Sequence, residues 1–292
     1  MEQGTVVKIH SNYYYVLCGD SLLECFLRGR LKKEKKQVMV GDNVCLQLTG
    51  KYTGVIEDIK PRKSCLKRPA AANLDQVIIV FSVKNPEPNT FLLDKFLVLA
   101  EEAGLEIIIC WQKADLLSEA ESTALGEMYR RIGYPVLVCS AKNGNGLDRL
   151  RDCLKDKLSV FAGPSGVGKS ALLNSLEQDL HLKTGELSAK IQRGKHTTRH
   201  VELLPLRSGG LVVDAPGFSS LDLSSIKPGE LAKYFPDLRA YISDCPSSCL
   251  HEKEKSCAVR EAVESGKIDK IRYEHYLKLL NELRNAKGVR RR

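Results

Sequence analysis

The stretch Gly163-Pro-Ser-Gly-Val-Gly-Lys-Ser170 decides the fold of the central part of the chain. It fits the pattern G-x-x-x-x-G-K-[ST], in which glycines let backbone N–H groups converge on phosphate oxygens beside the positive end of a helix. Residues 158–162 before it predict a short buried strand, and residues 171–176 after it predict the apolar face of a helix. This context favours a nucleoside triphosphate site over a glycine turn that binds nothing.

Within this loop, Lys169 is expected to reach the β- and γ-phosphates, and the Ser170 hydroxyl is expected to bind Mg²⁺. The remaining backbone and the first residue of the helix complete the predicted contact set. That set is Gly163, Pro164, Ser165, Gly166, Val167, Gly168, Lys169, Ser170 and Ala171.

The composition is that of an ordinary multidomain globular protein. Of 292 residues, 43% are hydrophobic and 28% are charged,. No apolar run approaches the length that spans a bilayer, and the N-terminus lacks a signal-peptide pattern, so we expect a cytoplasmic protein with no membrane partner. The sequence does not give the oligomeric state, for which a monomer is the default expectation. The formal net charge of +9 favours an anionic partner such as nucleic acid, although a merely basic solvated surface has the same composition,.

Three domains are predicted. Residues 1–68 contain five β-rich segments punctuated by turns, which suggests an OB-fold β-barrel,. The basic segment 28–36 and Tyr13, Tyr14 and Tyr15 could track phosphates and stack bases there, or could be a solvated loop and packed strand aromatics. Residues 69–221, after a linker at 61–72, alternate strands with helices and predict an α/β domain with a parallel sheet covered on both faces.

Residues 222–292 predict a helical domain interrupted by a cluster of cysteine and histidine. An amphipathic stretch there is marked by Val259, Ile268, Ile271, Leu279, Leu280 and Leu283,.

Two further motifs accompany the phosphate loop. Asp214-Ala-Pro-Gly217 follows an apolar strand and matches the D-x-P-G pattern of GTPases, with Asp214 holding Mg²⁺ through water and the Gly217 N–H contacting the γ-phosphate. Residues 194–199 lie where a switch loop would supply a threonine to Mg²⁺. Thr198 is favoured because Thr-Thr-Arg resembles the switch of other bacterial GTPases, whose second threonine binds the metal.

Two segments predict guanine recognition. Gln112-Lys-Ala-Asp115 follows a buried strand, and the Asp115 carboxylate would accept from the N1–H and N2–H₂ donors of guanine while Lys113 lies along the base. Ser140, Ala141 and Lys142 end another strand and resemble the backbone loop that meets the guanine oxygen. Each motif is weak alone, but together they sit at strand C-termini, where α/β sheets bind ligands.

The order of these motifs is unusual, because the base-recognition segments precede the phosphate-binding segments; the GTPase domain is circularly permuted. With its barrel and its Cys/His cluster, the chain resembles the RsgA family, also called YjeQ or YloQ. The resemblance implies hydrolysis of GTP to GDP stimulated by the small ribosomal subunit, late maturation of that subunit, and binding to its rRNA. One departure is Gln112, where the family carries Asn or Thr, and this could soften the base contacts.

In Ras-like enzymes a glutamine after the D-x-x-G glycine orients the attacking water. Here that position is Phe218, which forms no hydrogen bond, so intrinsic turnover should be slow. His196 matches the family's G-[RK]-H-T-T element and is the candidate for placing the water; alternatively it is a solvent-exposed histidine without a chemical role. Lys169, Ser170, Thr198 and Asp214 are predicted to stabilise charge and hold Mg²⁺.

Cys245, Cys249, His251 and Cys257 offer three thiolates and an imidazole within a short segment. This set suits one structural Zn²⁺ with no open coordination site, although chance clustering of reduced cysteines is the alternative. The family usually has four residues between the first two cysteines, and this chain has three.

A second hypothesis for the whole chain is a non-catalytic RNA-binding assembly module that uses GTP only as an occupancy signal, which Phe218 supports best. An ATPase or small-molecule kinase is disfavoured by Asp115 and the switch elements.

Overall fold

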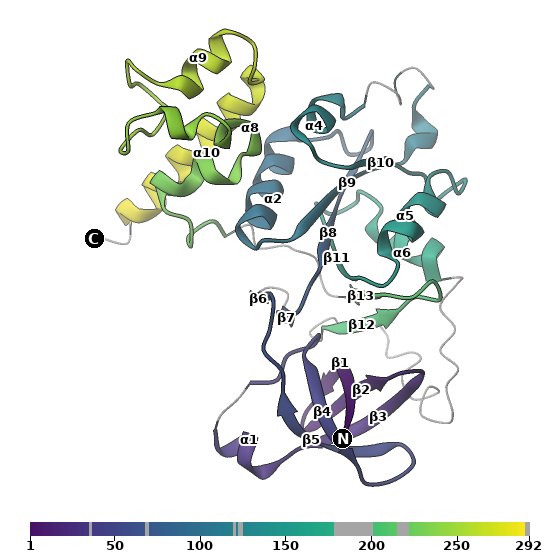
Figure 1. The fold of residues 1–292 in the computed structure, drawn as a ribbon. Coiled ribbons are helices and arrows are strands. Elements are labelled where there is room, and N and C mark those ends of the chain that lie inside the picture. The colour runs from purple at the N-terminus through teal and green to yellow at the C-terminus, as the bar shows by residue number, and fades with distance from the viewer. Residues whose placement is uncertain are drawn as a thin grey trace.

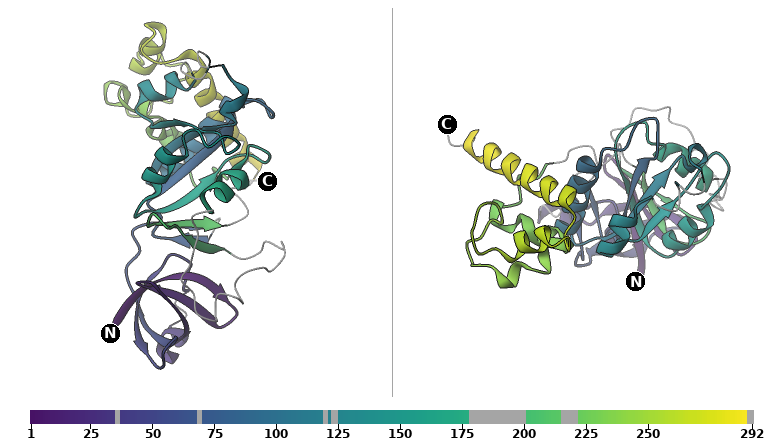
Figure 2. Two further views of the ribbon diagram at one scale, coloured as in Figure 1. Left: turned by 90° about the vertical axis from the view of Figure 1, so that its right-hand side faces the viewer. Right: turned by 90° about the horizontal axis from the view of Figure 1, so that it is seen from above.

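A computed structural model describes residues 1–34, 37–67, 70–118, 121, 125–177, 201–214 and 222–289. The chain forms a β-barrel, a central α/β domain and a helical C-terminal domain in sequence order (Figure 1). The barrel and the helical domain lie against different parts of the α/β domain, as the two further views also show (Figure 2).

The N-terminal barrel has the five predicted strands. They are β1 (Glu2–His10), β2 (Tyr13–Cys18), β3 (Ser21–Leu27), β4 (Asn43–Leu48) and β5 (Thr53–Ile59). Their order is β1-β2-β3-β5-β4, and a pairing between β4 and β1 closes the barrel around Val6, Val16, Val44, Leu46 and Ile56. This confirms an OB-like barrel. Part of the basic segment 28–36 forms a short helix, α1 (Gly29–Lys33).

The segment predicted as a linker is partly a structured joint. Strands β6 (Cys65–Lys67) and β7 (Ala70–Ala72) pair antiparallel, and Ala71 is bridged to Val40 of the barrel domain. Both Ala71 and Ala72 are fully buried. Small side chains are needed here because the backbones approach closely; a Cβ on Gly41 would lie 2.1 Å from the Ala72 carbonyl oxygen. The alanines of this segment therefore serve close packing between the barrel and the central domain, and this part of the predicted linker is not a flexible connection.

The central domain is built on one sheet. Its strands, in spatial order, are β10 (Val136–Val138), β9 (Glu106–Gln112), β8 (Gln76–Ser82), β11 (Leu158–Ala162), β13 (Leu211–Asp214) and β12 (Glu202–Pro205). All neighbouring pairs are parallel except β12 with β13. Every residue of β8 is buried, as expected for a strand covered on both faces,.

Helices cover the two faces of this sheet. Alternate residues of β8 belong to different apolar clusters: Ile79 and Phe81 to one, Ile78 and Val80 to the other. The first cluster includes α2 (Thr90–Glu102), and the second includes α5 (Leu147–Leu154) and α6 (Lys169–Glu177). The short helices η1 (Ala114–Leu116) and α4 (Glu127–Ile132) complete the described part of the domain. The predicted α/β architecture is confirmed.

The C-terminal domain is helical, as predicted. Its elements are η2 (Pro228–Tyr234), α8 (Pro236–Arg239), η3 (Ile242–Asp244), α9 (Ala258–Glu264) and α10 (Lys270–Val289). Val259, Ile268, Leu279, Leu280 and Leu283 are buried, but Ile271 is 52% exposed. The neighbouring Arg272 is buried in its place, so at this turn the inward face of α10 carries a charged residue.

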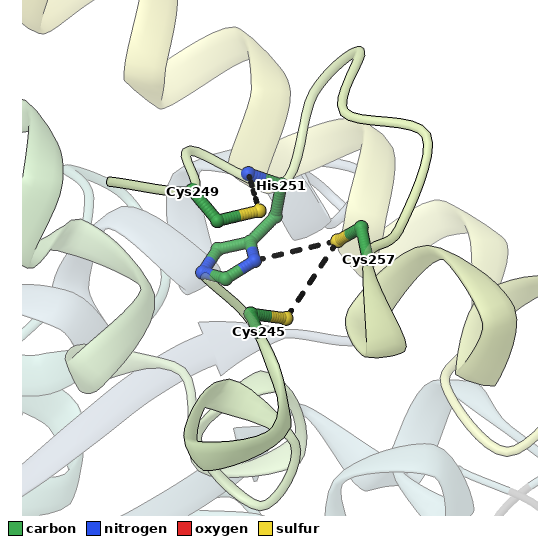
Figure 3. A group of neighbouring side chains, drawn as sticks. All are labelled: Cys245, Cys249, His251 and Cys257. Carbon is green, nitrogen blue, oxygen red and sulfur yellow. Dashed lines mark hydrogen bonds between the residues drawn. The ribbon is translucent and has the colours of Figure 1, made fainter. Parts of the chain in front are cut away.

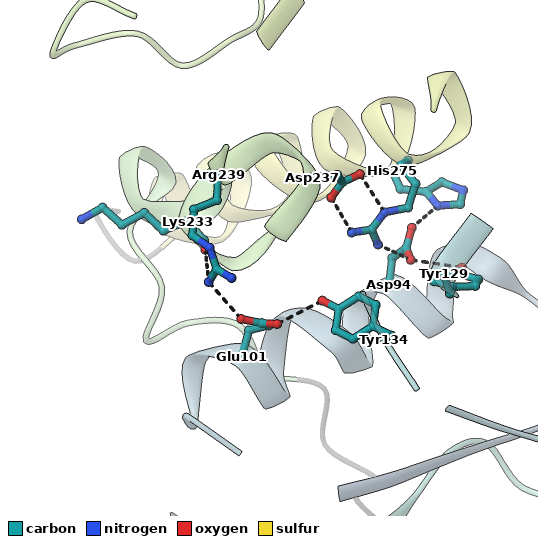
Figure 4. A network of polar contacts seen from close by, with 9 residues as sticks. Asp94, Glu101, Tyr129, Tyr134, Lys233, Asp237, Arg239 and His275 are labelled. Atoms are coloured by element: carbon teal, nitrogen blue, oxygen red, sulfur yellow. Dashed lines mark hydrogen bonds and ion pairs between the residues drawn. The ribbon is translucent and has the colours of Figure 1, made fainter. Parts of the chain in front are cut away.

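Buried charges dock this domain on α2. Arg272 contacts Asp94 of α2 at 2.5 Å and Asp237 of α8 at 2.9 Å, and Asp94 also accepts from His275 at 2.6 Å. At the exposed rim, Arg239 contacts Glu101 at 3.2 Å. Figure 4 shows Asp94 and Glu101 of α2 on the side of that helix that faces Asp237, Arg239 and His275.

Among the described residues, no helix has both the length and the apolar character needed to cross a bilayer.

Candidate nucleotide site and metal centre

The phosphate loop connects the end of β11 to the start of α6, the predicted strand–loop–helix arrangement. Gly163 has a φ of 134°, and a Cβ there would lie 2.1 Å from the Val80 carbonyl oxygen, so only glycine fits,. Val167 is buried in the cluster under α6 and anchors the loop. The ammonium of Lys169 donates to the carbonyls of Gly163 at 2.7 Å and Pro164 at 2.6 Å, and burial lowers the pKa of this lysine.

The two base-recognition segments lie beside each other. Asp115 accepts a hydrogen bond from the Ser140 hydroxyl at 2.7 Å, which fixes one carboxylate oxygen. Lys142 lies 3.8 Å from the other oxygen with its side chain largely exposed. These contacts bring together residues from the ends of β9 and β10, as predicted from their positions at strand C-termini.

The base-recognition segments are also joined to the phosphate loop. The Lys113 ammonium donates to the Gly166 carbonyl at 2.9 Å. Gln112 is 3% exposed, and its amide oxygen accepts from the backbone N–H groups of Lys113 at 2.8 Å and Ala141 at 3.3 Å. A Cβ on Gly168 would lie 3.0 Å from Gln112 Cγ. Gln112 therefore packs between the three segments and connects them.

Sequence reasoning missed one segment of this site, the loop after β8. The Lys113 ammonium also donates to the carbonyl of Asn85, and a Cβ on Gly166 would lie 3.9 Å from Pro86 Cδ. The signal was available, because residues 83–89 follow a buried parallel strand and so emerge at the same edge of the sheet as the other loops.

Some predicted site residues fall outside the described part of the chain. His196, Thr198 and Gly217 lie there, as does Phe218. The backbone of Asp214 ends β13, which is paired in parallel with β11, the strand that leads into the phosphate loop. The Asp214 side chain is not among the described atoms.

The Cys/His cluster is assembled at one place in the C-terminal domain. The four ligand atoms of Cys245, Cys249, His251 and Cys257 lie within 4.8 Å of one another. The sulfurs of Cys245 and Cys257 are 3.9 Å apart, and Cys257 Sγ is 3.5 Å from His251 Nδ1. Tetrahedral zinc with Zn–S bonds of about 2.3 Å needs sulfurs about 3.8 Å apart. The side chains converge on one point (Figure 3), so the set fits zinc despite the shorter spacing between the first two cysteines.

The surroundings of the cluster hold its loop in place. The hydroxyls of Tyr273 and Tyr276 on α10 each donate at 2.7 Å, to the carbonyls of His251 and Leu250. Burial raises the pKa of Cys249 to about 12 and lowers that of His251. A buried neutral imidazole is ready to bind a metal, whereas the thiol needs a divalent cation to favour its thiolate form.

Glu254 organises the same loop through its carboxylate. It accepts from the backbone N–H groups of Leu250 at 2.7 Å, Glu252 at 2.8 Å and Lys253 at 3.0 Å. Burial opposes ionisation, but these hydrogen bonds prevail and lower the pKa of Glu254 to about 2.

The fold and the site together define a circularly permuted P-loop GTPase that carries an N-terminal OB-like barrel and a C-terminal domain with a Cys₃His cluster. Comparison with known proteins supports this classification. The RsgA GTPase family model matches residues 59–224, and the RsgA N-terminal domain model matches residues 3–56. The chain therefore belongs to the RsgA family and is a GTP hydrolase.

Relatives match along nearly the whole chain. A "Small ribosomal subunit biogenesis GTPase RsgA" from Moorella thermoacetica is 49% identical over 96% of this chain and 97% of its own length. The protein of the same name from Alkaliphilus metalliredigens is 46% identical, over 97% and 98%. The crystal structure of YloQ, described as a circularly permuted GTPase, superposes with a TM-score of 0.83 at 40% identity, covering 98% of this chain and 96% of that one. YjeQ from Thermotoga maritima gives the same TM-score and identity, with coverage of 97% and 98%.

Proposed function

We propose that this GTPase acts in the biogenesis of the small ribosomal subunit in the cytoplasm, as a monomer that binds rRNA and hydrolyses GTP faster when bound to the subunit. The names of the relatives support the biological process. The observation that carries the nucleotide assignment is the joining of Gly166, Lys113, Asp115 and Ser140 at one sheet edge.

In this proposal guanine specificity depends on the orientation of the Asp115 carboxylate. Because one of its oxygens accepts from Ser140, the carboxylate is held in one orientation from which it can accept the N1–H and N2–H₂ donors of guanine. Adenine does not present that pair of donors. Lys113 would lie along the base. The backbone N–H groups of Ala141 and Lys142, which in this structure donate to Gln112 and Ser140, would turn to the guanine oxygen. In this proposal Gln112 holds these loops together and does not itself contact the base.

On the phosphate side, Lys169 would leave the carbonyls of Gly163 and Pro164 for the β- and γ-phosphates. Ser170, Thr198 and Asp214 would hold Mg²⁺, and the Gly217 N–H would contact the γ-phosphate. Developing charge on the phosphoryl oxygens is then stabilised by the lysine and by the N–H groups at the start of α6. We propose that His196 orients the attacking water, because Phe218 cannot.

The barrel offers a surface for rRNA. Tyr13 and Phe26 are cross-strand neighbours on β2 and β3, 38% and 42% exposed, with ring centroids 4.9 Å apart. Exposed aromatic rings stack nucleic-acid bases, and basic residues of the segment 28–36 follow directly in sequence. Tyr14 and Tyr15 are partly buried and are better placed to pack in the barrel wall.

For the C-terminal domain we propose one Zn²⁺ held by Cys245, Cys249, His251 and Cys257. When bound there, zinc supplies cross-linking of the loop and no chemistry, because four protein ligands fill a tetrahedral shell. The zinc site would thus support the docking of α10 on the GTPase domain.

The test is single-turnover GTP hydrolysis by the full chain, alone and with purified small subunits, for wild type, His196→Ala and His196→Gln. We expect strong stimulation of the wild type, a loss of about 100-fold in His196→Ala, and partial retention in His196→Gln, whose amide can still orient water. Affinity for a fluorescent GTP analogue should stay unchanged. Full stimulation of His196→Ala would remove this histidine from the mechanism. Absence of stimulation in the wild type would favour the occupancy-signal module.

A further inference from the structure

The barrel and the GTPase domain share a continuous sheet. Strand β1 of the barrel pairs antiparallel with β12 of the GTPase domain, so that an 11-stranded sheet runs from β10 to the barrel. In the register of this pairing Lys8 lies opposite Glu202, and their side chains form an ion pair of 2.9 Å. Both side chains are about three-quarters covered, at 23% and 27% exposure.

Strand β1 is shaped to contact both domains. A bulge between Val6 and Lys8 interrupts its pairing with β2,. Val6 belongs to the barrel core, whereas the next residue, Val7, belongs to the large cluster that includes Leu203 of β12 and Val213 of β13. Apolar packing therefore accompanies the Lys8–Glu202 pair, and a shift of β1 cannot leave β12 unaffected.

Glu202, the partner of Lys8, is also paired with a strand that leads into the nucleotide site. On its other side Glu202 is register-paired with Asp214, the aspartate of the D-x-P-G motif. Lys8, Glu202 and Asp214 thus occupy one row across three neighbouring strands. Glu202 also follows Thr198 by four positions in the sequence. Strand β12, with which the barrel pairs, therefore lies in the sequence between Thr198 and Asp214, the two residues after the phosphate loop that are predicted to hold Mg²⁺.

We propose that Lys8 and Glu202 are a positioning pair that transmits the position of the barrel to the metal side of the GTPase site. This rests on the proposed function, because the barrel is moved by docking on the small subunit. When β1 moves, the ion pair and the packing around Val7 make β12 move with it. Because Glu202 of β12 is paired with Asp214, the backbone of Asp214 then moves as well. Basal hydrolysis does not need the pair; acceleration by the subunit does.

The experiment uses charge exchange in the full chain. Single-turnover GTP hydrolysis is measured with and without saturating small subunits for wild type, Lys8→Glu, Glu202→Lys and the double exchange. We expect unchanged basal rates, a loss of about 10-fold in the accelerated rate of each single variant, and recovery in the double exchange; such a loss lies within the usual range of coupling between sites. Lys95→Glu is the matched control, because it makes the same charge reversal at another Lys–Glu pair between domains, Lys95–Glu282 at 2.7 Å, which joins α2 to α10 and involves neither β1 nor β12.

A second measurement is independent of the ribosome. Hydrogen exchange of the backbone amides of β1 and β12 is compared between the GDP state and a non-hydrolysable GTP state of the wild type. We expect exchange to differ between the two states, to rise in both single variants and to be restored in the double exchange. Full acceleration of either single variant, no recovery in the double exchange, or nucleotide-independent exchange at β12 would each overturn the proposal. If the subunit fails to accelerate the wild type, the proposed function fails, and hydrogen exchange alone decides the role of the pair.

Discussion

Replacing Arg272 by methionine should undock the C-terminal domain from α2. The guanidinium is 1% exposed and serves two buried carboxylates: Nη1 contacts Asp94 at 2.5 Å, while Nη2 and Nε contact Asp237 at 2.9 and 3.2 Å. Burial opposes the charged form, but Asp94 and Asp237 raise the pKa of Arg272, so the group is a permanent cation. Methionine would fill much of the volume of the arginine side chain, but both carboxylates would lose the positive charge of the guanidinium.

The expected loss is about 3 kcal/mol of unfolding free energy. Removing one partner of a buried ion pair costs about 3–5 kcal/mol because the other charge is left uncompensated. We expect the lower end, because Asp94 keeps the hydrogen bonds from His275 at 2.6 Å and Tyr129 at 3.2 Å. Arg272→Lys should fall between methionine and wild type, because lysine keeps the charge but cannot bridge both carboxylates with a planar fork.

The assay is urea unfolding of the zinc-loaded protein, followed by the fluorescence of Trp111, the single tryptophan, which is buried on β9. The matched control is Arg239→Met in the same interface. Its guanidinium contacts Glu101 at 3.2 Å with the side chain 53% exposed, so its loss should be under about 1 kcal/mol,. Equal effects of the two substitutions, or a change below about 1 kcal/mol for Arg272→Met, would refute the reasoning that burial makes this arginine the anchor.

Two further substitutions test the sites themselves. Asp115→Asn should weaken GTP binding at least about 10-fold and improve binding of xanthosine triphosphate, because an amide can donate to the 2-oxygen of xanthine where the carboxylate had accepted; competition with a fluorescent GTP analogue measures both, and unchanged GTP affinity would exclude Asp115 from base recognition. Glu254→Gln should destabilise the zinc loop by about 1–2 kcal/mol, because the amide accepts fewer of the three backbone N–H bonds and carries no charge. The pKa of about 2 in the folded state lies below the ordinary 4.5, so this contribution is complete above about pH 4.5 and declines as the pH falls toward 2,. Thermal unfolding and the rate of zinc loss to a chelator should differ between wild type and variant at pH 7, and the difference in stability should narrow below pH 4.5.

The sequence was informative wherever function restricts both residue type and spacing. The motif at 163–170, the segments 112–115 and 140–142, and the cluster from Cys245 to Cys257 could be found because each needs particular side chains at fixed separations. Strand and helix periodicity then placed them at one edge of a sheet, and the described loops do meet there.

The sequence was less informative where partners are distant along the chain. Arg272 interrupts an apolar pattern that favoured Ile271 for the buried face, and its burial makes sense only because Asp94 and Asp237 are near. The same holds for Lys8 and Glu202, which are ordinary surface charges until β1 and β12 pair. The loop after β8 could have been placed at the ligand-binding edge from its position after a buried strand, but not the particular contact of Lys113 with the Asn85 carbonyl, because a backbone group carries no signature in the sequence.

The pairing of β1 with β12 also determines what happens when the barrel is removed. Among the described strands, β12 is the last one of the GTPase sheet, and without β1 none of them would lie beside its outer backbone groups. Val7 of β1 belongs to the same apolar cluster as Leu203 of β12, so removing the barrel would expose part of that cluster beside the strand edge. An uncovered strand edge with adjacent apolar surface is a template for pairing with a second molecule. We therefore expect a GTPase domain truncated before the central sheet to self-associate through β12, even if its nucleotide site is intact.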